Sequence, residues 1–384
     1  MSARRFDVII VGAGPAGVSA AKSAAGVGAK TLLLEMNPRI MAMKPCGMAV
    51  SKATLKTAEV EPSPGLIHNE AECAIVYAPN MRFVKLHGTG YLINKTMLLQ
   101  EIACQAAERG AEIHVGERVL SVKRADGSMK VKTSRGVYEA SIVIGADGYN
   151  STVARSLGIR ERSEPIPTIQ CIMAGCRISD AGAFRFYLGN EVAPKGYAWI
   201  FPWNERIAEV GIGVRGAPIK PYLHRFIETF RDELGRAQII DYRGAPVPVG
   251  GVISEFIQDS VILIGDAAGM VIPMTGGGIH SSISSGLAAG QVSGEAALEG
   301  DTSKNRLMEF VEKYRPWLTR IKRSLKVLRV LENLGDDDLN LLAEILDERD
   351  IIDLANGLEV MRVAKKLLRH PRLAVKLAKP LLSG

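Results

Sequence analysis

Apolar residues occur along this chain in two patterns. The first pattern is a continuous run, as in "DVIIV" (7–11), "IVIG" (142–145) and "VILI" (261–264), with a glycine at or just after the end of each. Such runs indicate buried strands. Small residues with a helical pattern follow the first run and lead to another strand, "KTLLLE" (30–35). We therefore predict an α/β domain that begins with a strand–helix–strand unit.

The second pattern is an alternation of aromatic rings. In "PKGYAWIFPWN" (194–204), Tyr197, Trp199, Phe201 and Trp203 occupy every other position, although only 5% of the chain is aromatic. Aromatic residues favour strands, and the alternation places these rings on one face of a strand. Two interpretations are open at this point: a strand of an ordinary core, or one wall of a binding pocket.

Length and composition narrow the class of protein. A chain of 384 residues indicates two or more domains, and a hydrophobic fraction of 47% is typical of globular proteins. The apolar runs are too short to span a membrane, and residues 6–18 lack the pattern of a signal peptide. We therefore expect a cytoplasmic protein. Its five cysteines are irregularly spaced and form no C-x-x-C pair, so we expect reduced thiols and no metal site.

The N-terminal segment carries a dinucleotide fingerprint. Gly12, Gly14 and Gly17 have the spacing G-x-G-x-x-G. The first glycine permits a tight turn, the second lets the backbone approach a pyrophosphate, and the third allows close packing of helix and strand. Glu35 ends the next strand, where a carboxylate can accept hydrogen bonds from ribose hydroxyls. The order of strand, turn, helix and strand predicts a dinucleotide site.

A second match to this spacing, "GIGVRG" (211–216), stands in a different context. It is followed by "APIKP", and Pro218 and Pro221 make this a poor start for a phosphate-binding helix. We interpret the segment as a strand and a turn with no helix after it. The sequence therefore predicts no separate nicotinamide-nucleotide unit.

Two later segments favour FAD. "IVIGADGYNSTVAR" (142–155) is a strand, an Ala-Asp-Gly turn and a helix start, and residues 259–286 form a strand ending at Gly-Asp, a glycine-rich loop and a small-residue helix. With the first fingerprint, these motifs resemble the FAD-dependent reductases and aromatic hydroxylases of the glutathione-reductase-like class over roughly residues 5–300. The resemblance implies a Rossmann-like FAD-binding domain.

The late motif has a direct physical interpretation. Asp266 can bind ribityl hydroxyls, and the helix after the glycines directs its positive end toward the flavin ring, which favours the reduced, negatively charged flavin. Lys95 stands where relatives usually hold Arg or Gln near the FAD phosphates, and it keeps the charge without the guanidinium fork. The remaining FAD contacts implied by the resemblance are the Ala16 amide at the pyrophosphate, the Val119 backbone at the adenine, Asp147, Gly277, Gly278 and Ile279.

Within this class, "KPCGMAVSK" (44–52) resembles the cysteine-glycine segment of the geranylgeranyl reductases, which lies beside the isoalloxazine ring. The resemblance implies that Cys46, Gly47 and Ala49 contact FAD, although relatives often have another glycine near Ala49. Cys46 has two open interpretations: a group that assists the reaction, or a small residue that shapes the pocket.

The aromatic run matches the P-x-x-Y-x-W-x-F-P pattern of the same family. This match implies that Tyr197, Trp199 and Phe201 bind substrate as one wall of a long apolar pocket over the flavin. A prenyl chain has no polar group along its length, so apolar burial and broad aromatic faces must hold it. The core-strand interpretation stays compatible with this wall.

The resemblance predicts an enzyme that uses FAD to saturate C=C bonds of geranylgeranyl chains, chiefly of digeranylgeranylglycerophospholipids in archaeal-type membrane lipid synthesis. An isolated alkene accepts hydride poorly, so we expect protonation to be coupled to hydride delivery from the flavin. One alternative is an FAD-dependent monooxygenase or halogenase with an apolar substrate, and another is a non-catalytic flavin-containing protein that binds prenyl lipids. The electron donor, whether NADPH, ferredoxin or another carrier, is left open.

The sequence divides into three regions. We predict an FAD-binding domain from residues 1–62, 92–165 and 250–300, an antiparallel-sheet substrate domain from 63–91 and 166–249, and a helical region from 301–384. The net charge is +7, and from Val360 onward there are seven Lys and Arg residues and no Asp or Glu. We expect no nucleic-acid partner, because no motif for one is present. The basic end predicts either peripheral contact with an anionic membrane or a solvated helix face.

Overall fold

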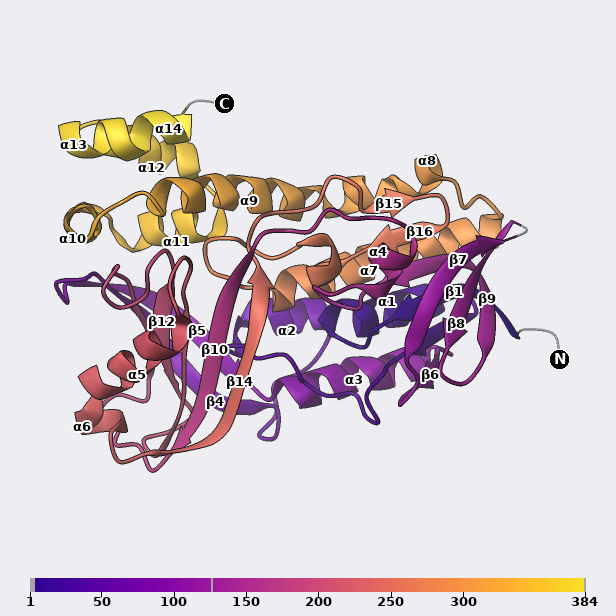
Figure 1. Cartoon of the computed structure of the whole chain (residues 1–384), viewed down its shortest axis with the longest axis horizontal. Coiled ribbons are helices and arrows are strands. Elements are labelled where there is room, and N and C mark those ends of the chain that lie inside the picture. The colour runs from indigo at the N-terminus through magenta and orange to yellow at the C-terminus, as the bar shows by residue number, and fades with distance from the viewer. Residues whose placement is uncertain (1–3, 126, 383–384) are drawn as a thin grey trace.

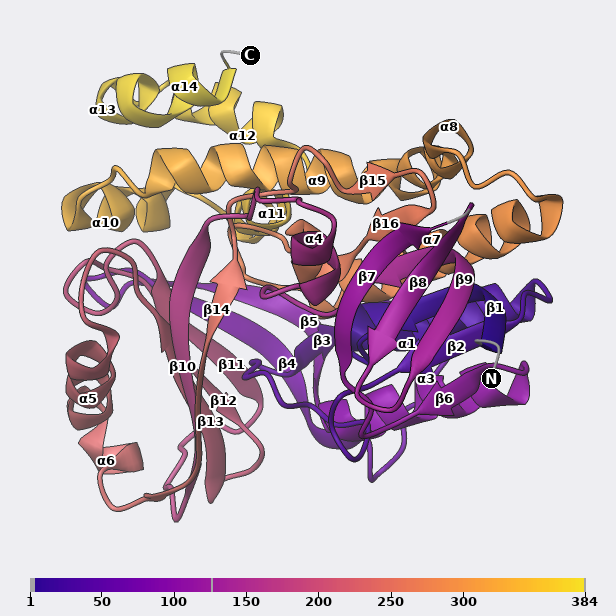
Figure 2. The same ribbon diagram turned by 45° about the vertical axis from the view of Figure 1, so that its right-hand side comes forward.

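A computed structural model describes residues 4–125 and 127–382, and it contains two eight-stranded sheets. Figure 1 shows the two sheets side by side along the long axis of the molecule, with the long helix α9 (Glu309–Leu331) running across both. Figure 2 shows the same arrangement from a second side, with the C-terminal helices beyond α9. The chain enters the second sheet and returns to the first, so each sheet is built from separated segments.

The first sheet confirms the predicted α/β unit. Its parallel neighbours, in spatial order, are β16 (Val261–Leu263), β9 (Val137–Gly145), β1 (Arg4–Val11), β2 (Thr31–Leu34) and β6 (Glu112–His114). The short β15 (Ile257–Gln258) and the hairpin of β7 (Val119–Ala125) and β8 (Ser128–Thr133) complete it by antiparallel pairing. The continuous apolar runs are these parallel strands, because both of their faces are covered.

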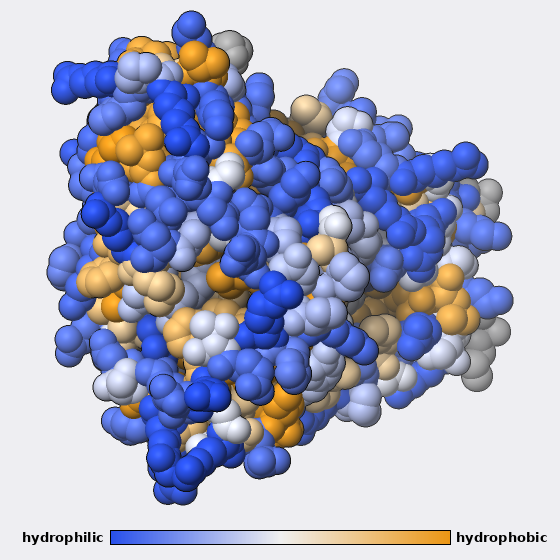
Figure 3. All heavy atoms as spheres, turned by 60° about the vertical axis from the view of Figure 1, so that its left-hand side comes forward, coloured by the Kyte–Doolittle hydropathy of each residue, from blue (hydrophilic) through white to orange (hydrophobic). Residues whose placement is uncertain are grey.

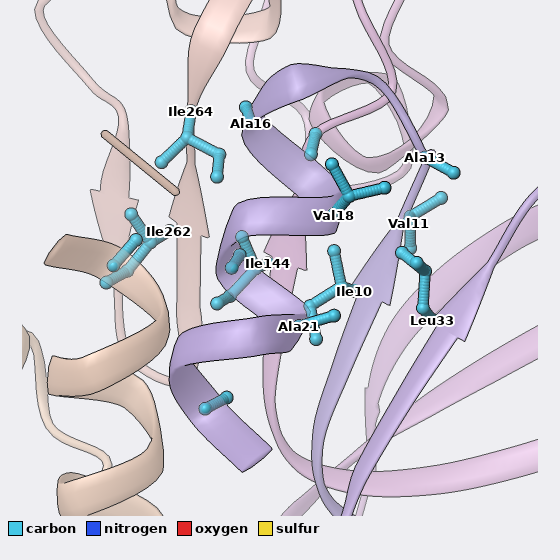
Figure 4. Packing of buried hydrophobic residues seen from close by; sticks show 14 of the residues in the cluster. Ile10, Val11, Ala13, Ala16, Val18, Ala21, Leu33, Ile144, Ile262 and Ile264 are labelled. Carbon is cyan, nitrogen blue, oxygen red and sulfur yellow. The ribbon is translucent and has the colours of Figure 1, made fainter. Parts of the chain in front are cut away.

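Helices α1 (Pro15–Gly26) and α7 (Ile279–Glu299) pack closely on this sheet. Figure 4 shows Val18 of α1 beside Ile10 of the sheet. The two helices can approach because glycines recur along α7: a Cβ on Gly290 would lie 2.3 Å from the carbonyl oxygen of Ala20. Helix α3 (Lys95–Glu108) packs against α1 as well. The small-residue pattern of both segments is therefore a packing requirement.

The second sheet lies beside the first. Its order is β14 (Gln238–Pro248), β10 (Pro165–Ala174), β13 (Ile207–Gly213), β12 (Tyr197–Pro202), β11 (Ala183–Tyr187), β4 (Ile67–Tyr77), β5 (Phe83–Ile93) and β3 (Ala49–Ser51). Its pairs are antiparallel except for β11 and β4, which run parallel. β3 joins this sheet by pairing with β5, although we placed residues 49–51 in the FAD-binding segment. The cysteine-glycine segment therefore leads directly from one sheet to the other.

The expectation that no helix follows residues 211–216 was wrong. Helix α5 begins at Ile219 and ends at Thr229, and the short α6 (Arg231–Leu234) follows. Pro221 falls in the first turn of α5, where the missing N–H costs no helical hydrogen bond. Leu223 and Phe226 bury the helix against β10 and β13, so α5 covers the outer face of the sheet.

The last part of the chain is helical, as predicted. The helices are α8 (Lys304–Leu307), α9, α10 (Asp336–Ile345), α11 (Glu348–Asn356), α12 (Val360–Leu367), α13 (Pro371–Leu373), the π-helical turn Ala374–Ala378 and α14 (Lys379–Leu382). Residues 360–382 turn most of their apolar side chains inward, into a core shared with α9. Among the described residues, no helix is both long and apolar enough to cross a bilayer.

The basic C-terminal segment is paired with acidic groups of the preceding helices. Arg362 binds the carboxylates of Asp350 at 2.7 Å and Asp353 at 2.8 Å. Lys376 binds Asp338 at 2.7 Å, and Arg372 reaches the same carboxylate at 2.5 Å. Lys366 also pairs with Asp347 and Asp350, so four of the seven basic residues of this segment are engaged by carboxylates. The charge available to an anionic surface is therefore smaller than the sequence indicates.

We expect Gly290→Ala to lower the free energy of unfolding by about 1–3 kcal/mol, because the new methyl group overpacks the contact between α1 and α7. Urea unfolding, followed by circular dichroism, measures the change through its midpoint. Gly136→Ala is the matched control, since its Cβ would meet no heavy atom of the described residues within 4 Å. Equal midpoints for the two variants would contradict the packing argument.

Candidate active site

The first fingerprint forms a tight turn between β1 and α1. Gly12 has a φ of +96°, and a Cβ there would lie 2.7 Å from the carbonyl oxygen of Ala146. A Cβ on Gly17 would lie 1.8 Å from the Gly12 oxygen, so this glycine permits the close packing of helix and strand. Gly14 faces open space, since no heavy atom of the described chain lies within 4 Å of its Cβ position. The first amides of α1 border this space and are suited to a pyrophosphate.

Glu35 closes the same turn from the end of β2. The residue is 8% exposed, and its Oε2 accepts a hydrogen bond from the Ala13 amide at 2.8 Å. Its Oε1 accepts from the backbone and side-chain amides of Asn37, at 2.9 Å and 2.6 Å. A carboxylate has about four acceptor positions, so the fixed group can still accept from a ribose hydroxyl.

Asp147 follows β9 and leaves one carboxylate oxygen without a partner. Its Oδ2 accepts from the amides of Thr152 at 2.6 Å and Val153 at 3.1 Å, at the start of α4 (Thr152–Ser156). Its Oδ1 is buried with no hydrogen-bond partner within residues 4–125 and 127–382. Burial raises the pKa of this carboxyl, and hydrogen bonds from Ser151 and the α4 amides oppose the rise. A buried polar atom without a partner indicates a place for a ligand.

The late motif supplies a second helix N-terminus. Asp266 lies in the 3-10 turn Gly265–Ala268, and Lys44 donates to its Oδ2. The prediction from the sequence did not include this ion pair, which leaves Oδ1 for a ribityl hydroxyl. Gly276 has a φ of +63°, and Gly278 is the N-cap of α7. The positive end of α7 therefore opens beside Asp266.

These segments line one cavity of about 900 Å³. Its wall includes every predicted site residue except Gly17: Gly12, Gly14, Ala16, Glu35, Cys46, Gly47, Ala49, Lys95, Val119, Asp147, Tyr197, Trp199, Phe201, Asp266, Gly277, Gly278 and Ile279. Gly17 lies behind the wall, as its packing role requires. Lys95, the first residue of α3, and Val119, the first residue of β7, are each 7% exposed.

The cysteine-glycine segment lies between the two sheets. The Cys46 amide donates to Oε1 of Gln170 on β10 at 2.8 Å, and the Met48 amide donates to the Cys46 Sγ at 3.5 Å. A Cβ on Gly47 would lie 2.9 Å from the Phe201 ring. Glycine at this position therefore lets the segment lie flat against the aromatic strand, with the Cys46 thiol at the cavity wall.

The aromatic run forms strand β12 and faces the cavity. Trp199 and Phe201 are 5% and 4% exposed, with ring centroids 6.1 Å apart, and Tyr197 lies 5.8 Å from Trp199. The indole crosses Gly211 on β13, where a Cβ would lie 2.0 Å from it. Trp203 differs from the other three rings, because it lies just after the strand and stacks on His68 at 3.9 Å.

The wall and the late motif are joined by a hydrogen bond. The Tyr197 hydroxyl donates to the carbonyl oxygen of Thr275, directly before the glycines. Burial, and then the field of Cys46, raise the pKa of the Tyr197 phenol, which therefore keeps its proton. Both interpretations of the run hold together: β12 belongs to a core and also forms the wall of the cavity.

Sequence reasoning missed a group of polar residues at this cavity. His280, the second residue of α7, shares a hydrogen bond of 2.9 Å with Thr57 and packs edge-on against Trp317 at 4.8 Å. The Arg320 guanidinium lies 4.3 Å over the same indole. Burial, and then the charge of Arg320, lower the pKa of His280 to about 4, so the imidazole is neutral at pH 7. The position of His280 two residues after three glycines was the available signal.

Sequence reasoning also missed Glu209. It is the one charged residue in "IAEVGIG" (207–213), an otherwise apolar stretch, and it is 0% exposed beneath the aromatic wall. A lone carboxylate in an apolar strand was the signal for it.

The residues present fit FAD. Two helix N-termini, the Glu35 and Asp266 carboxylates and the unpartnered Asp147 oxygen all border a single elongated space. Helix N-termini suit a pyrophosphate, and carboxylates at strand ends suit ribose and ribityl hydroxyls. Together, fold and site define a Rossmann-type flavoprotein oxidoreductase with FAD as its cofactor, which confirms the predicted class.

Comparison with known proteins identifies the family. Residues 166–247 match the model of the geranylgeranyl reductase catalytic domain, and residues 6–136 match the pyridine nucleotide-disulphide oxidoreductase model. The chain is 35% identical to digeranylgeranylglycerophospholipid reductase 2 of Methanopyrus kandleri, covering 98% of this chain and 99% of that protein. It is 37% identical to the digeranylgeranylglycerophospholipid reductase of Methanothrix thermoacetophila, covering 95% and 98%. The chain belongs to the geranylgeranyl reductase family.

Solved structures agree with this assignment. A geranylgeranyl bacteriochlorophyll reductase-like protein of Thermoplasma acidophilum superposes with a TM-score of 0.88 at 30% identity, covering 99% of this chain and 100% of that one. The myxobacterial FAD-dependent chondrochloren halogenase superposes with a TM-score of 0.69 at 17% identity, covering 87% of this chain and 84% of that one. At that identity, the halogenase shares the fold alone.

We expect Glu35→Ala to raise the Kd for FAD by about 10- to 100-fold, because hydrogen bonds to a charged group contribute roughly 1.5–3 kcal/mol. The substitution also releases the Ala13 amide and loosens the turn. Titration of the FAD-free protein, followed by flavin fluorescence, measures the change. The exposed Glu61, changed to Ala, is the control. An unchanged Kd in Glu35→Ala would remove this carboxylate from the site.

Proposed function

We propose that this chain is an FAD-dependent reductase that saturates the C=C bonds of geranylgeranyl chains, with digeranylgeranylglycerophospholipids of archaeal-type membranes as substrates. Membership in the geranylgeranyl reductase family supports the reaction, and the names of the relatives support the lipid class. The main observation in support of this function is geometric. One cavity joins three dinucleotide motifs to the aromatic face of β12, so a cofactor and an apolar chain can meet there.

The chemistry of an isolated alkene determines which steps need the cofactor and which need the protein. When bound in its reduced form, FAD supplies the hydride that one carbon of the double bond receives. The protein must hold the chain, exclude water and provide a proton for the other carbon. Trp199, Phe201 and Tyr197 present broad apolar faces that suit the first two tasks.

The Cys46 thiol is our candidate for the proton-bearing group at the cavity wall. Its backbone is fixed by Gln170 and its sulfur by the Met48 amide, so the position of the thiol is defined. The Tyr197 hydroxyl is already committed to the Thr275 carbonyl. The neutral His280 imidazole stands beside Trp317, at the α9 side of the cavity, and is not a strong acid.

The proposed function predicts a change in lipid mass. We expect the purified chain with bound FAD, chemically reduced and given a digeranylgeranylglycerophospholipid, to yield products heavier by two hydrogen atoms for each bond saturated. Lipid mass spectrometry measures this gain, and chemical reduction removes the need to know the natural donor. Incorporation of oxygen or halide in air would instead support a monooxygenase or halogenase. An unaltered lipid alongside reduced FAD would support a binding protein.

Two ring substitutions test the role of the aromatic wall in this assay. We expect Trp199→Ala to lower turnover on the order of tenfold or more, or to change which bonds are saturated, because the chain is no longer held in one position. Trp203→Ala is the matched control from the same run, since its ring stacks on His68 instead of facing the cavity. Both variants should keep FAD. Equal rates and products for the two variants would reduce the wall to a structural role.

We further propose that the C-terminal helices contact the membrane that holds the substrate. Met361, Leu368 and Val375 are 50%, 42% and 63% exposed. Figure 3 shows hydrophobic residues between hydrophilic ones at the top of the molecule, where α12 to α14 lie. Because four of the seven basic residues are paired with carboxylates, charge should contribute less than the sequence indicates, and apolar insertion should add to this contact.

This proposal predicts membrane binding that depends little on salt. We expect the protein to sediment with phospholipid vesicles, with only a modest loss as ionic strength rises, and the double change of Leu368 and Val375 to Glu to weaken binding several-fold. Val137→Glu is the matched control, because Val137 is 46% exposed on β9 at the other end of the molecule. Sedimentation of the double variant equal to that of the control would refute the contact.

A further inference from the structure

A buried carboxyl group lies directly behind the cysteine-glycine segment. Glu209 is 0% exposed in the middle of β13, and its Oε1 accepts a hydrogen bond from the Trp199 indole at 3.4 Å. Its Oε2 is buried and has no hydrogen-bond partner in the part of the chain that the structure describes. Neither the FAD contacts nor the aromatic wall requires a carboxyl group here. An apolar residue at this position would avoid the cost of burying one.

The surroundings of Glu209 connect it to Cys46. The Oε1 atom lies 3.7 Å from the position that a Cβ would occupy on Gly47, the neighbour of Cys46. The Cys46 amide is held by Gln170, which lies opposite Gly211 on the neighbouring strand. Cys46 lines the cavity, whereas Glu209 lies behind the wall. The carboxyl group is therefore placed to act on a substrate only through another residue.

Four groups from four segments act electrostatically on this carboxyl. They are the Cys46 thiol, the Trp199 indole on β12, the Lys95 ammonium on α3 and the Arg243 guanidinium on β14. Burial raises the pKa of Glu209 well above the usual range, and a negative charge on the Cys46 sulfur would raise it further, while the indole and the two cations lower it. The unpaired Oε2 fits a protonated carboxyl group, because a hydroxyl is less costly to bury than a charge.

We propose that Glu209 holds a proton in the resting protein and passes it to Cys46 after the thiol has protonated the substrate. This inference rests on the proposed function. The π electrons of the alkene form a C–H bond as the Cys46 S–H bond breaks, and the other carbon receives the hydride. The O–H bond of Glu209 then breaks as the S–H bond forms again. The carboxylate recovers its proton from solvent water before the next turnover.

Cys46 needs Glu209 as a partner because protonation of the substrate leaves a negative charge on the Cys46 sulfur. A thiolate in an apolar pocket is unfavourable, and it would draw back the proton it has just given. Transfer from Glu209 moves the negative charge to a carboxylate that has Lys95 and Arg243 within electrostatic reach. Glu209 is thus a positioning residue, since it supplies the proton through Cys46 and does not line the cavity.

Infrared spectroscopy tests the resting state without substrate. We expect the protein with oxidised FAD to show a protonated carboxyl C=O band at pH 7 that is absent from Glu209→Gln and shifted in Glu209→Asp. The difference between variants separates this band from that of Asp147, the other buried carboxyl with a raised pKa among the described residues. If wild type and both variants give the same carboxyl spectrum, Glu209 is ionised and the proposal is overturned. The aspartate variant keeps the test valid if the glutamine variant fails to fold.

The pH dependence of turnover tests the transfer. We expect wild-type kcat to fall as pH rises through the raised pKa of Glu209, because the acid form is the active one. Glu209→Gln should lower kcat on the order of 10²-fold with little change in KM or FAD content and remove this alkaline limb, and Glu209→Asp should restore part of both. A wild-type rate and profile in Glu209→Gln would overturn the transfer.

The two measurements also separate this inference from the proposed function. A chain that saturates no prenyl lipid in the mass-spectrometric assay disproves the function and the transfer step, whatever the infrared result. A chain that saturates the lipid but lacks the carboxyl band keeps its function and loses Glu209 as the proton source.

Discussion

The structure of the site depends on the close packing of residues 44–48 between the two sheets. Lys44 pairs with Asp266 at the end of the first sheet, and the Cys46 amide binds Gln170 in the second. Between them, Gly47 approaches the Phe201 ring more closely than any residue with a Cβ could. This segment is only a few residues long, so a shift of either sheet would strain it. It therefore fixes the distance between the cofactor groove and the aromatic wall.

Local rules explain why much of the fold could be predicted. The strands of the first sheet are continuous apolar runs, and Gly12 must be glycine because of its φ of +96° and the nearby Ala146 oxygen. Both requirements act within a few residues of the motif, and they appear in the sequence. The alternating rings of β12 could be predicted for the same reason, although Trp203, just beyond the strand, turns to His68.

The parts that could not be predicted depend on contacts between distant segments. The partner of Asp266 is Lys44, and nothing near either residue indicates the other. The basic C-terminal segment forms ion pairs with carboxylates such as Asp338 and Asp350. Less of its charge is therefore available for other interactions than the sequence indicates. Helix α5 forms although Pro218 precedes it and Pro221 lies in its first turn, because burial of Phe226 against the sheet outweighs a weak local propensity.

Under the proposed function, the aromatic wall has an electrostatic role in addition to burial. When a proton reaches one carbon of an isolated alkene, positive charge develops on the other carbon before the hydride neutralises it. The faces of Trp199 and Tyr197 carry negative quadrupole potential, and such faces stabilise cations in apolar surroundings. A charged carboxylate at the wall would stabilise the same carbon more strongly, but it would also invite water and capture the cation. Rings in front, with the Glu209 carboxyl group set behind them, provide the needed polarity without a carboxylate in contact with the chain.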